Sequence, residues 1–438
     1  MAYDEKKEIE PLPKTDVATG DVEDVVYDPK ATDDDFEVFK QTTDGVQFRV
    51  VGWVRASVIF LKNFAIVQGN FRNTHGHCHS IADMAEVVGG PILKEIVGGL
   101  FIIAYVLCTG SGIIGLSTGI NALSDHAACT VWFSFLSACF VIAAASVRKF
   151  EKIGWLTWAG FISVYIAVFI VVIGVTTRDR PAAAPQTGPF ELGYHAIAYP
   201  TFIAGMTATC TIFVSSAGTS AFLPVISEMR NPRDYNKAVY VCMAIVQASY
   251  LTFALIVYKW CGAYVANPSL GSAGPTLKKV AYGVGLIGLC VSGCLYLHVA
   301  AKYVFVRILR NSAHLQKNSL VHWGTWFSCT IILGALAFIL AEAIPIFSYL
   351  IALTGSICFA PLAIMLPAYL WLHDHWDYKS GMGALKMVVW YAHWFVILLG
   401  AFTCVAGTYG VIMNIKLAYA NGMIGGAFSC ADNSNTHG

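Results

Sequence analysis

Nine apolar stretches, each long enough to cross a membrane as a helix, dominate the sequence. A helix needs about 20 residues to cross a hydrocarbon core about 30 Å thick. Because lipid offers no hydrogen-bond partners, the backbone of each stretch has to bond within the segment, which favours helices over short alternating strands. We therefore predict an all-α, polytopic membrane helix bundle, with spans at residues 96–121, 127–147, 153–175, 197–225, 238–258, 281–301, 322–341, 345–371 and 387–414.

Charged residues are scarce and unevenly placed. Of the 438 residues, 56% are hydrophobic and 13% are charged, roughly half the charged share of a soluble domain. Fourteen of the 27 acidic side chains fall within residues 1–45, together with only five lysines. We predict residues 1–48 to be a disordered, acidic cytoplasmic tail, residues 49–415 to be the transmembrane domain, and residues 416–438 to be a short non-cytoplasmic tail.

The lysines and arginines between the spans indicate the orientation of the chain. Cytoplasmic loops are enriched in these residues, and alternate connections here carry fourteen and six of them. With nine spans, this places the segment before residue 95 in the cytoplasm and the C-terminus outside. Cys261 and Cys430 would then share the outer side, where they could pair, although packing in the core is the simpler interpretation of the thirteen scattered cysteines.

The longest uncharged stretch runs from Leu192 to Ser227, which is more than one crossing requires. Near its middle stands Ser215-Ser216-Ala217-Gly218-Thr219-Ser220, a run of small and hydroxylated residues that favours a break in the helix. A half-helix beginning at such a break directs free N–H groups and a positive dipole end into the bundle, which suits a carboxylate. The alternative is that these small residues let two helices pack closely.

Two other spans carry weaker polar signals. In the first, Thr109 and Ser111 lie beside glycines, and Ser111, Gly115 and Gly119 follow one helix face, which is typical of close helix packing. In the second, Ser292 and Tyr296 share a face with Gly288. His298 follows half a turn later. An ionisable side chain within a span is a functional candidate, although a hydrogen-bonded structural histidine is the other interpretation.

Several further residues are of types found in functional sites, but their positions and spacing do not favour a functional role. Glu342 lies at a helix end beside Pro345, where we expect it to be interfacial and in contact with water. His75, His77, Cys78 and His79 are spaced too tightly for a finger-type metal site, so we predict no metal and no cofactor. No P-loop, nucleophile elbow, GxGxxG or HExxH pattern occurs, which weighs against an ATP-driven pump or an enzyme.

Three segments resemble the fungal neutral amino-acid permeases of the amino acid/auxin permease family, methyltryptophan-resistance type. Gln68–Asn73, with the run from His79 to Gly90, resembles their first cytoplasmic loop. Phe222–Pro232 resembles the end of their sixth helix, and Ala427–Asn433 resembles their C-terminus. The chain departs from the family after Lys62, where a hairpin of two spans is missing, so that nine spans remain instead of eleven.

The resemblance implies an inverted-repeat, LeuT-like transporter that crosses the plasma membrane several times. It implies transport of neutral aliphatic and aromatic amino acids, with protons as the coupling ion. The protein is expected to lie in a lipid bilayer and to have no nucleic-acid partner. We assign the substrate site to Ser215, Ser216, Gly218 and Thr219 at the break and to Thr109, Ser111, Ser292 and Tyr296 along the cavity, with His298 as the proton-coupling candidate. The alternative function is that of a permease-like membrane protein that senses amino acids or regulates an intact permease without transporting.

Overall fold

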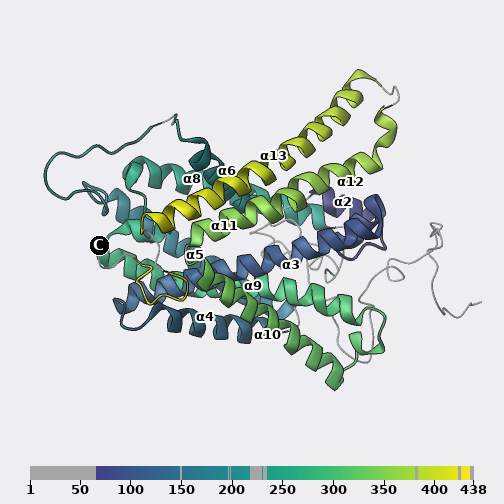
Figure 1. Ribbon diagram of the computed structural model, residues 1–438, viewed down its shortest axis with the longest axis horizontal. Helices are drawn as coiled ribbons and strands as arrows, with labels where there is room; N and C mark the ends of the chain where they lie inside the picture. The colour runs from purple at the N-terminus through teal and green to yellow at the C-terminus, as the bar shows by residue number, and fades with distance from the viewer. Residues whose placement is uncertain are drawn as a thin grey trace, which may run out of the picture.

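The computed structural model describes residues 66–147, 150–195, 197, 199–217, 229, 234–379, 383–422 and 426–434. Within these ranges the chain is a bundle of long helices (Figure 1). The helices are α2 (Ile66–Thr74), α3 (Ile81–Ser124), α4 (Thr130–Ala145), α5 (Phe150–Thr176), α6 (Phe202–Ala217), α8 (Tyr235–Cys261), η3 (Gly262–Tyr264), η4 (Ser269–Ala273), α9 (Pro275–Leu309), η5 (Ala313–Leu315), α10 (Leu320–Ala343), α11 (Phe347–Thr354), η6 (Gly355–Met365), α12 (Leu366–Asp374), η7 (Trp376–Lys379) and α13 (Ala384–Ala420).

The predicted all-α membrane helix bundle is confirmed. Seven helices of the described part are long and apolar enough to cross a membrane. The predicted spans at 127–147 and 197–225 correspond to α4 and α6, which are apolar but shorter, at 16 residues each. Large apolar side chains such as Leu398 and Val405 of α13 point outward and are mostly exposed, as expected for a surface whose solvent is lipid.

The start of α3 shows how local sequence sets a helix end. Ser80 caps the helix by accepting a hydrogen bond from the backbone N–H of Asp83, while the Asp83 carboxylate accepts from the N–H of Ser80. This reciprocal capping box satisfies two otherwise free N–H groups. Gly90, at φ +73°, then kinks the helix just before Pro91, because proline cannot continue the hydrogen-bond ladder of the preceding turn.

Two helices, α3 and α9, form the centre of the bundle. They pack along one another, and α5, α4 and α10 pack around them. At their crossing, Gly112 of α3 meets Gly293 of α9 so closely that a Cβ on Gly112 would lie 3.0 Å from the Gly293 Cα. Gly119 is equally tight, since a Cβ there would lie 2.8 Å from a Leu286 methyl. Small residues therefore serve close helix packing here.

A second layer consists of α6, α11, η6, α12 and α13, with α13 lying along α12 (Figure 1). The segment η6 is a π-helix of 11 residues containing Pro361. Such wide turns are rare, and they occur frequently at functional sites. Asn414 of α13 donates a hydrogen bond to the Thr207 hydroxyl of α6 at 2.7 Å, which joins these two helices by a half-buried polar contact.

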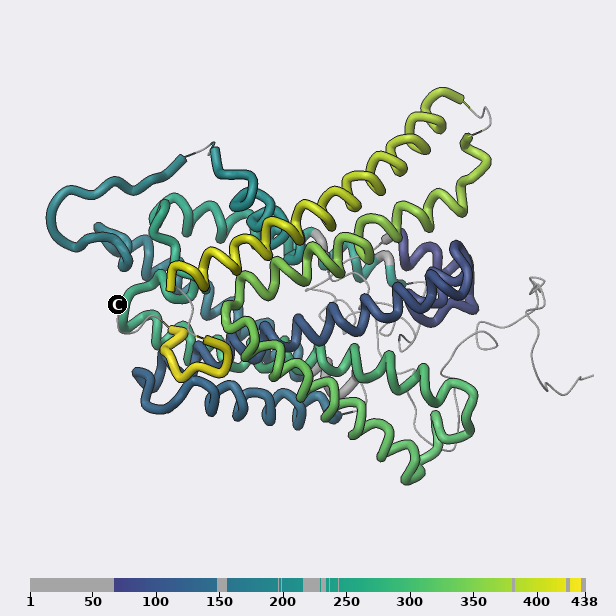
Figure 2. The backbone as a smooth tube through the Cα atoms, in the orientation of Figure 1, coloured from purple at the N-terminus to yellow at the C-terminus, as the bar shows by residue number. Residues whose placement is uncertain are grey.

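The C-terminal segment returns to the bundle and lies against the beginning of α4, where Figure 2 shows it as a yellow loop. A disulfide joins Cys430 to Cys129, immediately before α4. The interpretation of all thirteen cysteines as core residues is therefore wrong for Cys129 and Cys430. The pairing of Cys430 with Cys261, which the sequence left open, is wrong as well, because Cys261 is a free, buried cysteine. Hydrogen bonds from Asn121 to Asn433 and from Thr130 to the Ala431 carbonyl add to the attachment.

Candidate functional site

The predicted site residues of α3 and α9 lie on the two central helices. Thr109 and Ser111 are buried, and their hydroxyls donate to the carbonyls of Tyr105 and Cys108 on their own helix. Ser292 donates likewise to the Gly288 carbonyl at 2.7 Å. Ser111 and Ser292 directly precede the crossing glycines in sequence. Because these hydroxyls bond to their own helices, their oxygens remain available as acceptors.

A group of aromatic rings lies beside this part of the two helices, and of these only Tyr296 was predicted as a site residue. The Tyr296 ring of α9 lies 6.1 Å from the ring of Tyr105. Tyr105 in turn contacts Phe101 at 4.6 Å and the edge of Phe359, from the π-helix η6, at 6.0 Å. The structure therefore brings predicted residues of α3 and α9 next to a side chain of η6.

The predicted break in the sixth helix falls mostly outside the described residues. Helix α6 is described as far as Ala217, so Gly218 and Thr219 lie beyond it, and only the backbone of Ser216 is described. Ser215 is exposed, and its hydroxyl donates to the Ile212 carbonyl at 2.6 Å. Because α6 packs against α11, α13 and η6, η6 is the element shared between α6 and the aromatic group.

His298 is fully buried on α9, with 0% of its surface exposed. Its Nδ1 lies 3.2 Å from the carbonyl oxygen of Ala145 at the end of α4, and its ring meets the edge of Trp326 of α10. These contacts tie three helices together. They fit the structural interpretation of His298, and its role in proton coupling stays a prediction.

Glu342 differs from its expected setting. It lies at the end of α10, as predicted, but its side chain is only 4% exposed. It lines a cavity of about 210 Å³ together with Thr118, Ser134 and residues of the C-terminal segment, among them Asp432. Ser134, which faces this cavity with Glu342, donates its hydroxyl proton to the Ser117 hydroxyl at 3.0 Å. The burial of Glu342 could not be predicted from the local sequence, because the residues that cover it lie about 90 positions further along the chain.

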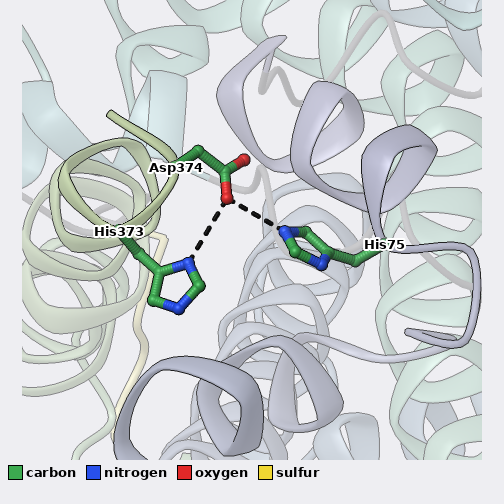
Figure 3. A group of neighbouring side chains, drawn as sticks. All are labelled: His75, His373 and Asp374. Carbon is green, nitrogen blue, oxygen red and sulfur yellow. Dashed lines mark hydrogen bonds and ion pairs between the residues drawn. The ribbon is translucent and has the colours of Figure 1, made fainter. Parts of the chain in front are cut away.

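At the opposite end of the molecule, His75 meets two residues that end α12 (Figure 3). Its Nε2 lies 2.9 Å from Asp374 Oδ1, which is also 3.3 Å from His373 Nδ1. The three ligand atoms lie within 4.8 Å of one another, so among the described residues this trio has the donor set to hold a metal ion. The sequence singled out His75 but grouped it with His77, Cys78 and His79 instead.

Burial governs the protonation of that histidine-rich loop. It lowers the pKa of His79 to about 4, with a further contribution from the Arg310 charge, and raises the pKa of the Cys78 thiol to about 12. The pKa of His77 is lowered for the same reason and by the neighbouring His75. A thiol with a raised pKa is a poor metal ligand at neutral pH, so Cys78 behaves as a core residue.

Comparison with known proteins identifies the family. The model for transmembrane amino acid transporter proteins matches residues 71–413. A protein named "Transmembrane transporter" from Gibberella moniliformis is 48% identical over 91% of both chains. The "N amino acid transport system protein" of Neurospora crassa is 26% identical over 84% of this chain and 78% of its own. The crystal structure of MhsT in complex with L-phenylalanine aligns with 84% of this chain and 96% of its own, at 14% identity and a TM-score of 0.43. The chain therefore belongs to the transmembrane amino acid transporter family.

Proposed function

We propose that this chain carries neutral aliphatic and aromatic amino acids across the plasma membrane in symport with protons. The observation that carries the proposal is the meeting of uncharged hydroxyls and aromatic rings where α3 crosses α9. Thr109, Ser111, Ser292 and Tyr296 offer hydrogen bonds without net charge. The rings of Tyr105 and Phe359 add apolar surface beside them.

A site of this composition favours neutral side chains. A substrate with a charged side chain would have to leave water, and such a transfer is costly unless an opposite charge compensates it. Aromatic and aliphatic side chains lose nothing comparable, and they gain contacts with the rings. The α-carboxylate that all amino acids share would bind at the predicted break of the sixth helix, around Ser215, Ser216, Gly218 and Thr219, where a helix N-terminus favours an anion.

The proposed orientation places the N-terminus in the cytoplasm. Basic residues are concentrated in the connections assigned to that side. The Cys129–Cys430 disulfide supports the same assignment, because disulfides persist on the oxidising side of a membrane and are rare in the cytoplasm. The α3–α4 connection and the C-terminus would then both face outward.

The test is uptake of labelled amino acids in cells that lack their own permeases. We expect phenylalanine and leucine to accumulate, with an outside-acidic pH gradient increasing uptake and a protonophore abolishing the increase. Lysine and glutamate should not compete. Tyr296→Ala should lower uptake at least tenfold. Tyr409→Ala, a change at an exposed tyrosine of α13, should leave uptake unchanged. Equal competition by charged and neutral amino acids would refute the proposed substrate class.

The alternative of a non-transporting sensor or regulator makes a different prediction in the same cells. Purified protein would bind neutral amino acids, yet no uptake would be seen. The departure after Lys62 supplies the control, since a version carrying a family-like hairpin at that position should then gain transport. Uptake by the unaltered chain would exclude this alternative.

A further inference from the structure

We infer that Glu342 is the residue that takes up the coupling proton from the outer side, an assignment that rests on the proton symport proposed above. Glu342 combines three features. It is a carboxyl group at the end of a membrane helix, it is buried, and it faces a partly polar cavity of about 210 Å³. One water needs roughly 10–15 Å³ of such volume, so the cavity has room for a chain of waters that can deliver protons.

The hydroxyl network beside Glu342 can accommodate both of its protonation states. Ser117 donates to the Thr130 carbonyl, and Ser134 donates to the Ser117 hydroxyl at 3.0 Å. A hydroxyl has one proton to donate. While this chain of donors holds, the Ser134 hydroxyl has no proton left for Glu342, so a hydrogen bond between the two would need the protonated acid as its donor. To donate to an ionised Glu342 carboxylate, Ser134 would have to turn and give up its bond to Ser117.

Charged groups of both signs lie around the cavity, on the C-terminal segment, on α9 and at the end of α3. Asp432 lines the same cavity, and a second carboxylate nearby disfavours ionisation of the first. On α9, the Lys278 ammonium donates to the Ser434 carbonyl at 2.6 Å, which places a positive charge next to Asp432. Asp125 and Lys279 form an ion pair at this end of the bundle, and His126 bonds to Asn121.

The C-terminal segment forms part of the wall of the cavity. Its backbone contacts Glu342 directly, since the N–H of Phe428 donates to the Glu342 carbonyl at 3.4 Å. The disulfide from Cys430 to Cys129 and the bond from Asn433 to Asn121 hold the segment over α3 and α4. A proton arriving from outside passes beside this segment and moves from a hydronium ion to a carboxylate oxygen of Glu342, leaving neutral water. No other covalent bond is made or broken.

The assignment is tested with purified protein in liposomes. Glu342→Gln keeps the shape of the protonated acid but cannot release a proton. We expect it to lose accumulation driven by a pH gradient at least tenfold, while exchange of labelled for unlabelled phenylalanine, which needs no net proton movement, persists. His298→Gln is the matched variant for the other candidate, and Asp432→Asn should shift the pH profile of accumulation while coupling is kept. Proton-driven accumulation by Glu342→Gln at the level of the unaltered chain would overturn the assignment.

A spectroscopic readout separates this inference from the symport proposal. Infrared difference spectra of the unaltered chain between two pH values should contain the carbonyl stretch of a buried carboxylic acid, and Glu342→Gln should lack it. If the unaltered chain shows no proton-driven accumulation although this band is present, the symport proposal fails and the protonation site stands. If Glu342→Gln folds, as judged by size-exclusion chromatography, and the band is unchanged in it, the assignment fails whatever the transport result.

Discussion

Gly112 of α3 and Gly293 of α9 meet backbone to backbone, with a Cβ at position 112 placed 3.0 Å from the Gly293 Cα. The spacing of α3 and α9 where they cross depends on this contact. The two atoms nearest to that Cβ, the Cα and N of Gly293, belong to the main chain, which cannot rotate away as a side chain can. The crossing is thus intolerant of any added atom.

Gly112→Ala should destabilise the bundle by about 1–3 kcal/mol, the usual cost of overpacking a closely fitted interior. Gly99→Ala is the control on the same helix, because a Cβ there meets nothing within 4 Å, and exchanging glycine for alanine inside a helix is favourable by about 1 kcal/mol. Thermal unfolding in detergent, followed by fluorescence-detected size exclusion, measures both. Equal melting temperatures for the two variants would contradict the tight crossing.

Reduction of the Cys129–Cys430 disulfide should lower the melting temperature of the unaltered chain. The bond closes a loop with a sequence separation of 301, and long loops lose most entropy when closed in the unfolded chain. We expect the double variant Cys129→Ser/Cys430→Ser to melt lower and to be insensitive to reductant. Cys261→Ser, at a free cysteine, should stay as sensitive as the unaltered chain. Insensitivity of the unaltered chain would contradict the pairing.

Local features of the sequence predicted much of the fold. Long apolar runs placed nine helices, because the requirement for internal backbone bonding in lipid acts on each segment separately. Ser80 as a helix cap was predictable for the same reason, since its partner Asp83 is only three residues away. The inverted repeat remains an expectation from the family resemblance.

Features that depend on distant parts of the chain were not predictable. The choice of Cys129 over Cys261 as the partner of Cys430, the burial of Glu342 under the C-terminal segment, and the meeting of His75 with Asp374 each join residues 80 or more positions apart. The π-helix η6 has no simple sequence period to reveal it. Of the candidate site, hydroxyls on α3 and α9 were found from their helical spacing, whereas the aromatic residues Tyr105 and Phe359 were missed because aromatic residues are common in every span.

Asp83→Asn should destabilise the end of the bundle where α3 begins by about 1–3 kcal/mol, because it weakens a cap and an ion pair together. The Asp83 carboxylate accepts from two backbone N–H groups and from Arg310 Nη1 at 2.9 Å. Glu86→Gln is the control, since Glu86 is more exposed and its ion pair, within the described part of the chain, is with Lys94. A double-mutant cycle with Arg310→Ala measures how much the Asp83–Arg310 ion pair contributes to the free energy of unfolding. A coupling energy of zero would show that the ion pair does not stabilise the fold.

The buried His79 predicts a loss of stability in mild acid. Its folded-state pKa of about 4 lies below the ordinary value of 6.5, so the unfolded chain takes up a proton first as the pH falls. The free energy of unfolding should therefore decrease between about pH 6.5 and pH 4 and level off below, by of the order of 1–2 kcal/mol after allowing for partial exposure of the ring. His79→Gln should remove this part of the pH dependence. His195→Gln, at an exposed histidine, should leave this pH dependence unchanged. Melting curves of the two variants at pH 7 and pH 5 make the comparison. An unchanged slope in His79→Gln would mean that the ring is solvated in the folded protein.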